Sequence, residues 1–572
     1  MKRTGSWAER QIPLANIDNP EKEMENNHEP DYEAKAVPAR ELGMCSTLKI
    51  YFREYCENSS LHGIRYMGEK GRSTTERIWW VLIFVASIFM CSHLIHKTWI
   101  KWNLSPVIVS FAQSPTPVWQ VPFPAVTICS ETKARQSVFN FTEAYHSREN
   151  LSELTAEQIK NFEDVSLICD THLYTDGNKT TDQSAIDFIH DVAPQFEEML
   201  FKCKWTNKLG TNCTELFFPT LTEEGLCYTF NMLDSPELLS EEAQNEHYLN
   251  HGEKSLWSLD GGYPKGTNMS VYPRRALGAG IKAGLTILMR AYEYDLDYIC
   301  RGPVQGFKIL LHNPAETPRV SQQYFRAPLN QEVIVAVQPD MMTTSDGLKD
   351  YHPSRRHCYF PNEKQLRFYK VYTQQNCEVE CLTNFTLNRC GCVAYHMPRA
   401  QNTPICGSGS TKCVATAQVD LLQQEVQSEI NEENLEFTGE ISNSPQKCNC
   451  LPACTSLTYN AETSQADFNW PKLFQAFKAD LNEMPGIQMT RVNIFFKGTQ
   501  FITSRRSELY GQTDFLANCG GLLGLFMGFS FLSLIEIVYF LTLRMWCNIK
   551  MHGRRMWSST KIDHLRASKE KH

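Results

Sequence analysis

Ala517-Asn-Cys-Gly-Gly-Leu-Leu-Gly-Leu-Phe-Met-Gly-Phe-Ser530 is the stretch of this sequence that constrains the fold most strongly. It leads into an apolar run, residues 522–543, whose only formal charge is a single glutamate. Twenty-two residues are enough for a transmembrane helix. Gly520, Gly524 and Gly528 recur every four residues and predict one smooth helix face for close packing in a membrane. The simplest explanation of such a face is that two copies of an inert membrane anchor dimerise through it.

Ser530, Ser533 and Glu536 follow the glycines at three-residue steps, which places them on roughly one stripe of a helix. A carboxylate inside a bilayer is energetically costly and normally faces water or a partner. Several copies of this helix around an axis would form a wet cation path lined with hydroxyls, carbonyls and acid. The stripe therefore favours a pore over a plain packing face.

A second apolar run lies near the other end of the chain. Residues 78–95 contain no Asp, Glu, Lys or Arg and are just long enough to span a bilayer. The alternative is a buried core helix. Tryptophans stand near the ends of the two runs, at Trp79, Trp80, Trp99 and Trp546. Since tryptophans and basic residues anchor helices at membrane interfaces, they favour two membrane spans.

The flanking charges predict the orientation of these spans. No apolar run opens the sequence, which predicts an uncleaved anchor rather than a signal peptide. The tail, residues 544–572, carries eight Lys or Arg against two acids, and the 20 residues before the first span carry four basic residues. Because basic residues favour the cytoplasmic side, we predict that both termini are cytoplasmic.

Between the spans lies a long polar segment with 16 of the 21 cysteines, from Cys129 to Cys454. It also contains seven N-x-S/T sequons, at Asn103, Asn140, Asn150, Asn178, Asn212, Asn268 and Asn384. Cysteine density together with sequons indicates an oxidising, extracellular compartment, and we predict glycosylation at all of the sequons except Asn103.

Strand-like and helix-favouring runs alternate along this segment and predict an α+β ectodomain. The strand-like runs are residues 121–129, 285–290, 306–312, 332–337 and 492–496. The helix-favouring runs are 421–437 and 468–481. The fold class is therefore a two-transmembrane-helix membrane protein with a large disulfide-rich α+β extracellular domain.

Five parts follow from these patterns. They are a cytoplasmic N-terminal arm (1–77, with 1–45 disordered), transmembrane helix 1 (78–100), an extracellular cysteine-rich domain (101–512), transmembrane helix 2 with the pore (513–543) and a cytoplasmic C-terminal tail (544–572).

Composition and spacing argue against several other functions. A net charge of −8 gives no sign of nucleic-acid binding. The C-x-C and C-x3-C spacings could suit zinc, but an oxidising compartment favours disulfides, whose pairing composition alone leaves open. His247 and His251 beside Glu246 lack the register of a metalloprotease helix. No nucleophile–base arrangement is visible, so we predict neither an enzyme, nor a cofactor, nor a metal.

The chain resembles the degenerin/epithelial sodium channel family, and its insect pickpocket branch in particular. The matching motifs are His62-Gly63, Phe123-Pro-Ala-Val-Thr-Ile-Cys129, Gly225-Leu-Cys-Tyr-Thr-Phe230, the cysteine series, and Gly520-Gly521 through Gly528-Phe529-Ser530. Each motif alone is weak, whereas their joint order is specific. The resemblance implies a trimeric, acid-sensing-channel-like architecture in the plasma membrane, homomeric or with related subunits. It also implies sodium permeability and sensitivity to amiloride.

Residue roles carry over from the same motifs. Gly528, Phe529 and Ser530 correspond to the selectivity filter, where oxygen ligands replace the hydration water of the ion. Phe529 departs from the Ala, Ser or Gly common at the middle position, so the sodium-over-potassium preference stays open. The remaining roles are pore lining for Ser533 and Glu536, the degenerin gate position for Ala517, and the gating motif for His62 and Gly63.

The resemblance also implies how the cysteines pair. The implied disulfides are Cys129–Cys227, Cys203–Cys213, Cys358–Cys454, Cys377–Cys450, Cys381–Cys448, Cys390–Cys413 and Cys392–Cys406. Cys169 and Cys300 are left over, and a bond between them is the expectation. Cys519, at the mouth of the implied pore, is expected to be free.

The sequence does not identify the gating stimulus, which is acid, a peptide, a small chemical, force or no stimulus at all. The acidic run 425–436 favours a solvated helix face, and the family offers proton sensing as the alternative. Two other functions compete with a sensory cation channel. An ATP-gated trimeric channel would lack the Gly528-Phe-Ser530 element and the cysteine series. A non-conducting or modulatory two-span receptor subunit would not need Glu536 and its serines inside a membrane helix.

Overall fold

The computed structural model describes residues 44–104, 107–147, 155–169, 176–206, 212–243, 254–438, 448–478, 485–509, 511–552 and 557. The chain divides into two units, Met1–His96 with Ala517–His572, and Lys97–Leu516. Apart from residues 44 and 45, the predicted disordered arm lies outside the described residues. Asn150, a predicted glycosylation site, and His247 and His251, weighed above as zinc ligands, also lie outside the described residues.

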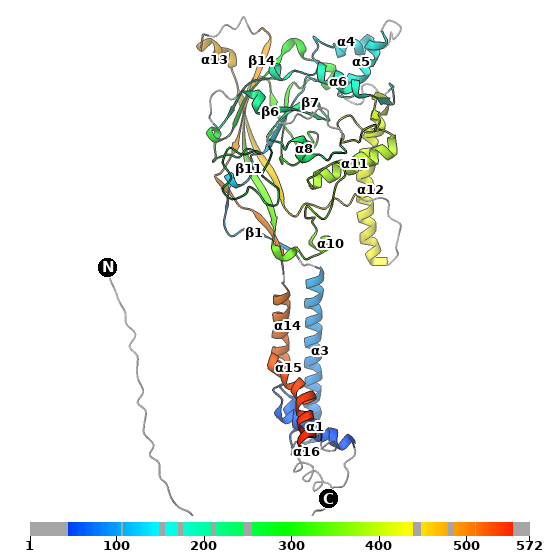
Figure 1. Ribbon diagram of the computed structural model, residues 1–572, viewed down its shortest axis with the longest axis vertical. Helices are drawn as coiled ribbons and strands as arrows, with labels where there is room; N and C mark the ends of the chain where they lie inside the picture. The colour runs from blue at the N-terminus through cyan, green and yellow to red at the C-terminus, as the bar shows by residue number, and fades with distance from the viewer. Residues whose placement is uncertain are drawn as a thin grey trace, which may run out of the picture. The chain divides into compact units, whose positions relative to one another are not determined.

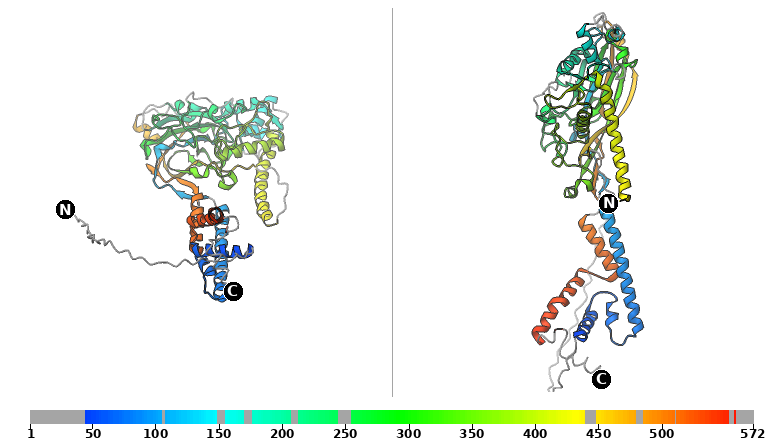
Figure 2. Two further views of the ribbon diagram at one scale, coloured as in Figure 1. Left: turned by 60° about the horizontal axis from the view of Figure 1, so that its bottom comes forward. Right: turned by 90° about the vertical axis from the view of Figure 1, so that its right-hand side faces the viewer.

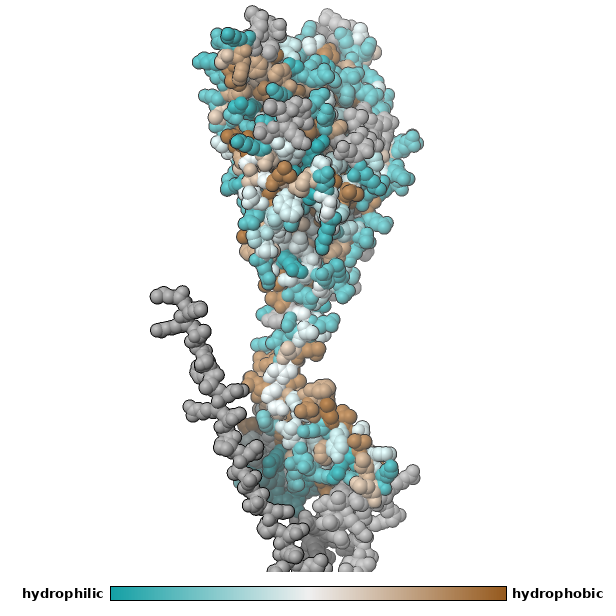
Figure 3. Space-filling view, turned by 60° about the vertical axis from the view of Figure 1, so that its left-hand side comes forward, coloured by the Kyte–Doolittle hydropathy of each residue, from teal (hydrophilic) through white to brown (hydrophobic). Residues whose placement is uncertain are grey.

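The first unit is helical. Its elements are α1 (Met44–Asn58), α2 (Ile64–Gly68), α3 (Thr74–Leu104, shared with the second unit), α14 (Gln512–Met527, likewise shared), α15 (Phe531–Val538), the π-helical turn η9 (Tyr539–Arg544) and α16 (Met545–His552). Two helices are long and apolar enough to cross a membrane, Thr74–Leu104 and Phe531–Met551. Figure 3 shows hydrophobic side chains on the surface of these helices. Over the second unit, hydrophilic side chains predominate in the same view.

The C-terminal helix is interrupted where the glycine repeat predicts continuity. α14 ends at Met527, Gly528 adopts a left-handed conformation with φ +65°, and α15 begins at Phe531. The expectation that Gly528 shares one helix face with Gly520 and Gly524 is therefore wrong. The physical reason is local, because glycine enters left-handed backbone without a steric cost and Ser530 supplies the cap of a new helix.

The second unit is built on two sheets. The larger has the order β1-β16-β11-β14-β8-β5, with β13 paired to β11, and the smaller has the order β10-β9-β3-β7-β6. The strands of the larger sheet are β1 (Val107–Phe111), β16 (Ser504–Glu508), β11 (Gln331–Thr344), β14 (Ile487–Phe496), β8 (Leu285–Tyr292), β5 (Leu200–Trp205) and β13 (Ser456–Asp467). Those of the smaller are β10 (Phe325–Pro328), β9 (Gly306–His312), β3 (Ala125–Ser130), β7 (Gly225–Phe230) and β6 (Phe217–Thr222). Each strand-like run of the sequence overlaps one of these strands.

Aromatic packing joins the two sheets. The ring of Phe123 lies 4.9 Å from that of Trp205 on the larger sheet and 5.2 Å from that of Phe496, centroid to centroid. Phe230 of the smaller sheet lies 5.2 Å from the same tryptophan. Since buried aromatic side chains contribute large apolar areas, this cluster is a main source of the stability of the unit.

Helices cover the edges of these sheets. α4 (Phe141–Ser147), α5 (Ala156–Ser166) and α6 (Gln183–Val192) form one group. α11 (Gln374–Cys390) and α12 (Thr411–Thr438) pack against each other at one edge of the unit (Figures 1 and 2). The helix-favouring run 421–437 lies within α12, although the side chains of its last residues lie outside the described part. The run 468–481 forms only the short α13 (Trp470–Ala476), and residues 479–484 are outside the described part.

Eight disulfides cross-link this unit, and their pairing is the one that the resemblance implies. Seven are Cys129–Cys227, Cys203–Cys213, Cys358–Cys454, Cys377–Cys450, Cys381–Cys448, Cys390–Cys413 and Cys392–Cys406, and the eighth joins Cys169 to Cys300. The antiparallel register of β3 and β7 places Cys129 directly opposite Cys227. Among the cysteines whose side chains the structure describes, the free thiols are Cys56, Cys91, Cys519 and Cys547.

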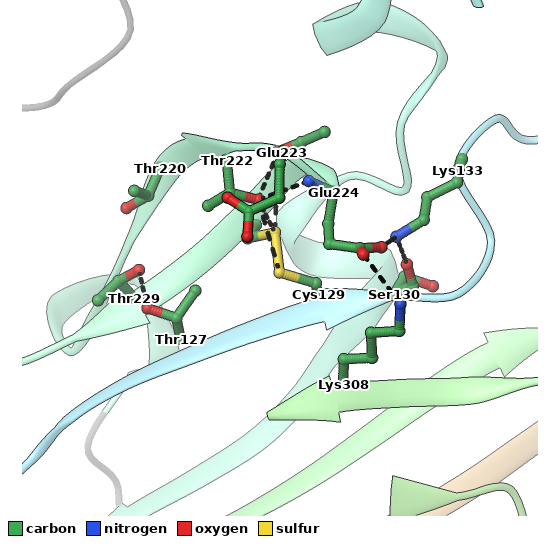
Figure 4. Close-up of a disulfide and its surroundings, with 12 residues drawn as sticks. Thr127, Cys129, Ser130, Lys133, Thr220, Thr222, Glu223, Glu224, Thr229 and Lys308 are labelled. Atoms are coloured by element: carbon green, nitrogen blue, oxygen red, sulfur yellow. Dashed lines mark hydrogen bonds and ion pairs between the residues drawn. A yellow bond between two sulfur atoms is a disulfide. The ribbon is translucent and has the colours of Figure 1, made fainter. Parts of the chain in front are cut away.

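A buried charge cluster lies beside the Cys129–Cys227 disulfide (Figure 4). The Glu224 carboxylate is 2.6 Å from Lys133 Nζ, 2.8 Å from Arg301 Nη2 and 2.9 Å from Lys308 Nζ. Its side chain is only 5% exposed. Burial acts to raise the pKa of Glu224, but the Lys133 and Arg301 charges outweigh it and hold the pKa at about 2. Glu131 supplies a second buried carboxylate to the cluster, 3.9 Å from Lys308 Nζ. Glu224 is the carboxylate that contacts all three cations.

We predict that Glu224→Gln destabilises the second unit by roughly 3–5 kcal/mol, because it leaves three largely buried cations around a neutral amide, with Glu131 near Lys308 as the remaining carboxylate. Thermal and urea unfolding of the detergent-solubilised full chain would measure this loss. A carboxyl with a depressed folded-state pKa stabilises the fold above its unfolded pKa, here taken as the ordinary 4.5. That stabilisation is lost as the pH falls from 4.5 towards 2. Because the amide of Glu224→Gln does not titrate in this range, the free energy of unfolding of the variant should not show this loss between pH 4.5 and 2.

The matched control is Glu462→Gln. Glu462 accepts from Lys497 at 2.7 Å, but the two side chains are 70% and 53% exposed. Exposed ion pairs contribute about 0–1 kcal/mol, so this variant should unfold almost as the unmodified chain does. Equal unfolding of the Glu224 and Glu462 variants would show that the buried cluster does not stabilise the unit.

Candidate functional site

The site of interest is the break in the C-terminal helix, where the His62-Gly63 segment meets it. The His62 amide donates to the Met527 carbonyl at 3.0 Å, at the point where α14 ends. The imidazole lies directly against Gly528, so that a Cβ added there would overlap His62 Nδ1, Cε1 and Cγ. Two motifs 465 residues apart, which the sequence predicts separately, are thus brought into contact.

Gly63 turns the chain from this contact into α2. It has φ +87°, a conformation that L side chains rarely adopt, and it stands immediately before Ile64. A Cβ at Gly63 would approach the Trp80 ring of α3 at 3.6 Å, which is ordinary van der Waals contact. The requirement for glycine therefore comes from the backbone conformation rather than from lack of space.

Ser530 starts α15 as its N-cap. Its hydroxyl accepts from the Ser533 amide at 3.2 Å, and the Ser533 hydroxyl accepts from the Ser530 amide at 3.2 Å. Such reciprocal capping satisfies amides that the helix start leaves without partners. The Ser530 side chain remains exposed, so its hydroxyl is available for a further ligand.

The rest of the predicted polar stripe is engaged by the N-terminal segment. Ser533 is 1% exposed, and its hydroxyl lies 2.7 Å from that of Ser60. The Ser60 amide donates to Glu536 Oε2 at 3.0 Å. These contacts give Ser533 and the carboxylate partners within the same chain, which the sequence did not indicate.

Phe529 turns its side chain into an apolar cluster. The cluster has Cys56, Leu61 and Ile64 at its centre, with Phe84 and Ile537 also packed against it. The aromatic ring therefore packs with α1, α2 and α3 side chains, and this explains how a bulky residue fits between a glycine and a serine.

A second set of contacts anchors α1 to the C-terminal helices. Glu54 accepts from Arg544 Nη2 at 2.6 Å, and the Phe540 ring lies 6.2 Å from Tyr51 and 5.4 Å from Tyr55. The Tyr51 hydroxyl also donates to the Phe540 carbonyl. No motif in the sequence singles out these residues. Their only signal in the sequence is spacing. Tyr51 and Tyr55 are four residues apart, as are Phe540 and Arg544, so the members of each pair lie on one helix face.

Ala517 lies apart from the helix break. It belongs to α14 and its side chain is exposed in the single chain. Eleven residues separate it from Gly528, about 16 Å along a helix axis. The structure thus gives Ala517 no contact with the His62-Gly63 segment, and its predicted role depends on contacts between chains.

The other predicted sites lie on the second unit. Among the described sequons, Asn178, Asn212, Asn268 and Asn384 are exposed, whereas Asn140 is half-buried and donates to Glu143 at 3.3 Å. Within the described part of the chain, no three His, Cys, Asp or Glu side chains are grouped to hold a metal ion.

Comparison with known proteins identifies the family of this chain. A family model described as amiloride-sensitive sodium channel matches residues 55–540. Pickpocket protein 28 of Drosophila melanogaster is 31% identical over 530 residues, covering 88% of this chain and 80% of that protein. Acid-sensing ion channel 2 of Homo sapiens is 23% identical over 505 residues and covers 84% of each chain. Sodium channel protein Nach of Drosophila ananassae is 23% identical over 534 residues and covers 90% of each chain.

Among solved structures, a proton-activated chloride channel aligns with 81% of this chain and 96% of its own, at a TM-score of 0.26 and 6% identity, too low a likeness to support any inference. The family match spans most of the chain and includes both halves of the site, and the resemblance to pickpocket proteins is confirmed. The family consists of ion channels rather than enzymes. The chain belongs to the amiloride-sensitive sodium channel family.

Proposed function

We propose that this chain is a subunit of a gated, sodium-permeable, amiloride-sensitive cation channel in the plasma membrane, with a sensory role. The observation that carries the proposal is the break of the C-terminal helix at Gly528, Phe529 and Ser530. A helix end frees backbone carbonyls from intrahelical bonds. Carbonyl and hydroxyl oxygens at one level around an axis are what a cation filter requires, because they replace hydration water.

The proposed assembly is a trimer in which both termini are cytoplasmic and the second unit is extracellular. Two candidate membrane helices, eight disulfides and exposed sequons support this topology. In such an assembly Gly528, Phe529 and Ser530 form the filter, Ser533 and Glu536 belong to the inner pore, and Ala517 forms the outer gate. The His62-Gly63 segment supports the filter from the cytoplasmic side. The trimer is either homomeric or formed with related subunits.

Expression of the chain alone, with recordings under ion substitution and with amiloride, tests the proposal. We expect an inward current that is carried by sodium and blocked by amiloride, given a suitable stimulus. Protein delivered to the surface that stays silent with every stimulus, alone and after Ala517 substitution, would instead favour the modulatory, non-conducting subunit. The family match favours either function over the ATP-gated alternative.

Gly528→Ala should abolish or strongly reduce the current. The added methyl group would overlap the His62 imidazole, and the left-handed backbone would cost about 1 kcal/mol more. If overlap is the cause, His62→Ala in the same chain should restore part of the current by removing the ring. The measurement is whole-cell current normalised to surface protein. A Gly528→Ala channel with normal current and selectivity would contradict this contact.

Gly521→Ala is the matched control. Gly521 lies within α14, and a Cβ there meets no described heavy atom within 4 Å. Because alanine favours a helix over glycine by about 1 kcal/mol, this variant should fold normally and keep its current unless Gly521 packs against another chain.

Ser530→Cys should change the relative permeability of sodium and potassium, because it replaces an oxygen ligand by a larger, softer sulfur at the proposed filter. Glu536→Gln should mainly lower the unitary current, since it removes a negative charge that concentrates cations. The amide oxygen can still accept from the Ser60 amide, so the local fold should persist. Reversal potentials and single-channel recordings separate the two effects. Unchanged selectivity and conductance in both variants would show that this stripe does not line the pore.

Ala517→Val and Ala517→Phe should produce a standing inward current. Where helices from three subunits converge, a larger side chain overpacks the closed state by typically 1–3 kcal/mol, and an open state with separated helices avoids this. A difference of about 2 kcal/mol raises the open-to-closed ratio roughly thirtyfold. Surface-delivered variants without standing current would mean that Ala517 faces lipid and is not the gate residue.

A further inference from the structure

The C-terminal helix changes its hydrogen-bond pattern directly after α15. Tyr539–Arg544 form the π-helical turn η9, in which an amide bonds to the carbonyl five residues earlier instead of four. Such a turn holds one residue more than an α-helical turn, and π-turns are frequent at functional sites. The Thr542 hydroxyl donates to the Val538 carbonyl at 2.6 Å, a contact that slightly destabilises and bends α-helices. The turn is therefore a place where this helix can change its form.

The helix α1 contacts both ends of this turn, and Figures 1 and 2 show it beside the C-terminal helices. Near the start of the turn, the Phe540 ring packs against Tyr51 and Tyr55, and the Phe540 carbonyl accepts from the Tyr51 hydroxyl. At the last residue of the turn, Arg544 donates to Glu54 at 2.6 Å. Phe540 is 8% exposed, and the side chains of the ion pair are 29% and 22% exposed. These contacts are thus largely shielded from water, unlike an ordinary surface ion pair.

The two contacts depend on the extra residue of the turn. Successive residues of an α-helix are about 100° apart around its axis. Conversion of the turn to α-helix shifts the later residues by one position around the helix, so Arg544 would turn by up to about 100° relative to Phe540. A rigid α1 could then keep its contact with one of these residues but not with both. The pair of contacts therefore favours the π-helical form.

A third contact connects Tyr51 to α16, the helix that follows the turn. The Trp557 ring lies 5.7 Å from the Tyr51 ring, centroid to centroid, and the Trp557 carbonyl accepts from Asn548 Nδ2 at 3.2 Å. Asn548 is 1% exposed. Because Asn548 comes after the turn, the same rotation would carry its side chain out of this enclosed position. The accessibility of position 548 therefore reports on the form of the turn.

We propose that α1 is a clamp that holds η9 in its π-helical form, with Tyr51 and Glu54 as the positioning residues. When α1 withdraws, the turn converts to α-helix and α16 rotates by up to about 100° relative to α15. The consequence for current rests on the proposed function, because in that channel this helix is the inner end of the pore helix. The clamp itself lies within one chain and can be tested without any current.

Thiol labelling of the full chain, purified in detergent, tests the clamp. In the Asn548→Cys variant we expect slow labelling of position 548 by N-ethylmaleimide. Glu54→Arg in the same chain places like charges together and should speed this labelling at least about tenfold. Adding Arg544→Glu restores a pair of opposite charges and should return the rate to its original value. Mass spectrometry of the labelled peptides separates position 548 from the native thiols.

A deletion separates conversion of the turn from simple loosening of the helix. Leu541 is 65% exposed, and its deletion removes the extra residue, so that Phe540 and Arg544 can keep their places with an α-helical turn between them. No conversion is then left to occur. Glu54→Arg should therefore leave position 548 slow to label in the deletion background, whereas loosening would speed labelling in both backgrounds.

The matched control is Glu57→Arg, which reverses a charge whose ion pair, with Arg53 at 3.8 Å, lies within α1. It should label as the Asn548→Cys chain does. Tyr51→Phe is a milder variant, which removes the hydroxyl donor, keeps the ring, and should speed labelling roughly two- to tenfold.

Unchanged labelling in both Glu54→Arg and Tyr51→Phe, or equal acceleration in the deletion background, would overturn the clamp. The outcome is independent of the proposed function. A chain that stays silent in recordings but follows this labelling pattern would contradict the channel and support the clamp. A conducting chain without the pattern would contradict the clamp alone.

Discussion

The helical unit depends on one backbone residue, Gly528 in the left-handed region. At φ +65° it stops α14 and lets Ser530 cap a new helix, and without a side chain it leaves room for His62. No other residue type meets both requirements, because any Cβ would strain the backbone and overlap the imidazole. The interrupted helix and the docked N-terminal segment are therefore consequences of the same glycine.

The N-terminal segment also contacts the C-terminal helices at several other places. Ser60 bridges to Ser533 and Glu536, Phe529 completes an apolar cluster, and Glu54 pairs with Arg544. Because these contacts involve the same elements as the proposed filter, a displacement of α1 or α2 would reach the filter directly. These packed contacts are consistent with the gating role proposed for the segment before the first span.

The second unit is stabilised by a different set of interactions. Two sheets are joined by aromatic packing, and disulfides fix the α11–α12 pair and the segments around Cys358 and Cys454. Buried charge is present as well, since Glu224 lies among three cations beside the Cys129–Cys227 bond.

The sequence by itself determined the two apolar helices, the cysteine-rich α+β region and the order of motifs that identifies the family. These signals are local, since hydropathy, strand alternation and motif order are properties of neighbouring residues. Local signals did not predict the helix break at Gly528, because glycines that repeat every four residues are also typical of a continuous, closely packed helix. Only the tertiary structure decided that His62 lies on Gly528, that Tyr51 and Tyr55 meet Phe540, and that Glu224 lies among three cations. Each of these contacts joins residues far apart in the chain, and their proximity results from the global packing of helices and sheets, which no local pattern encodes.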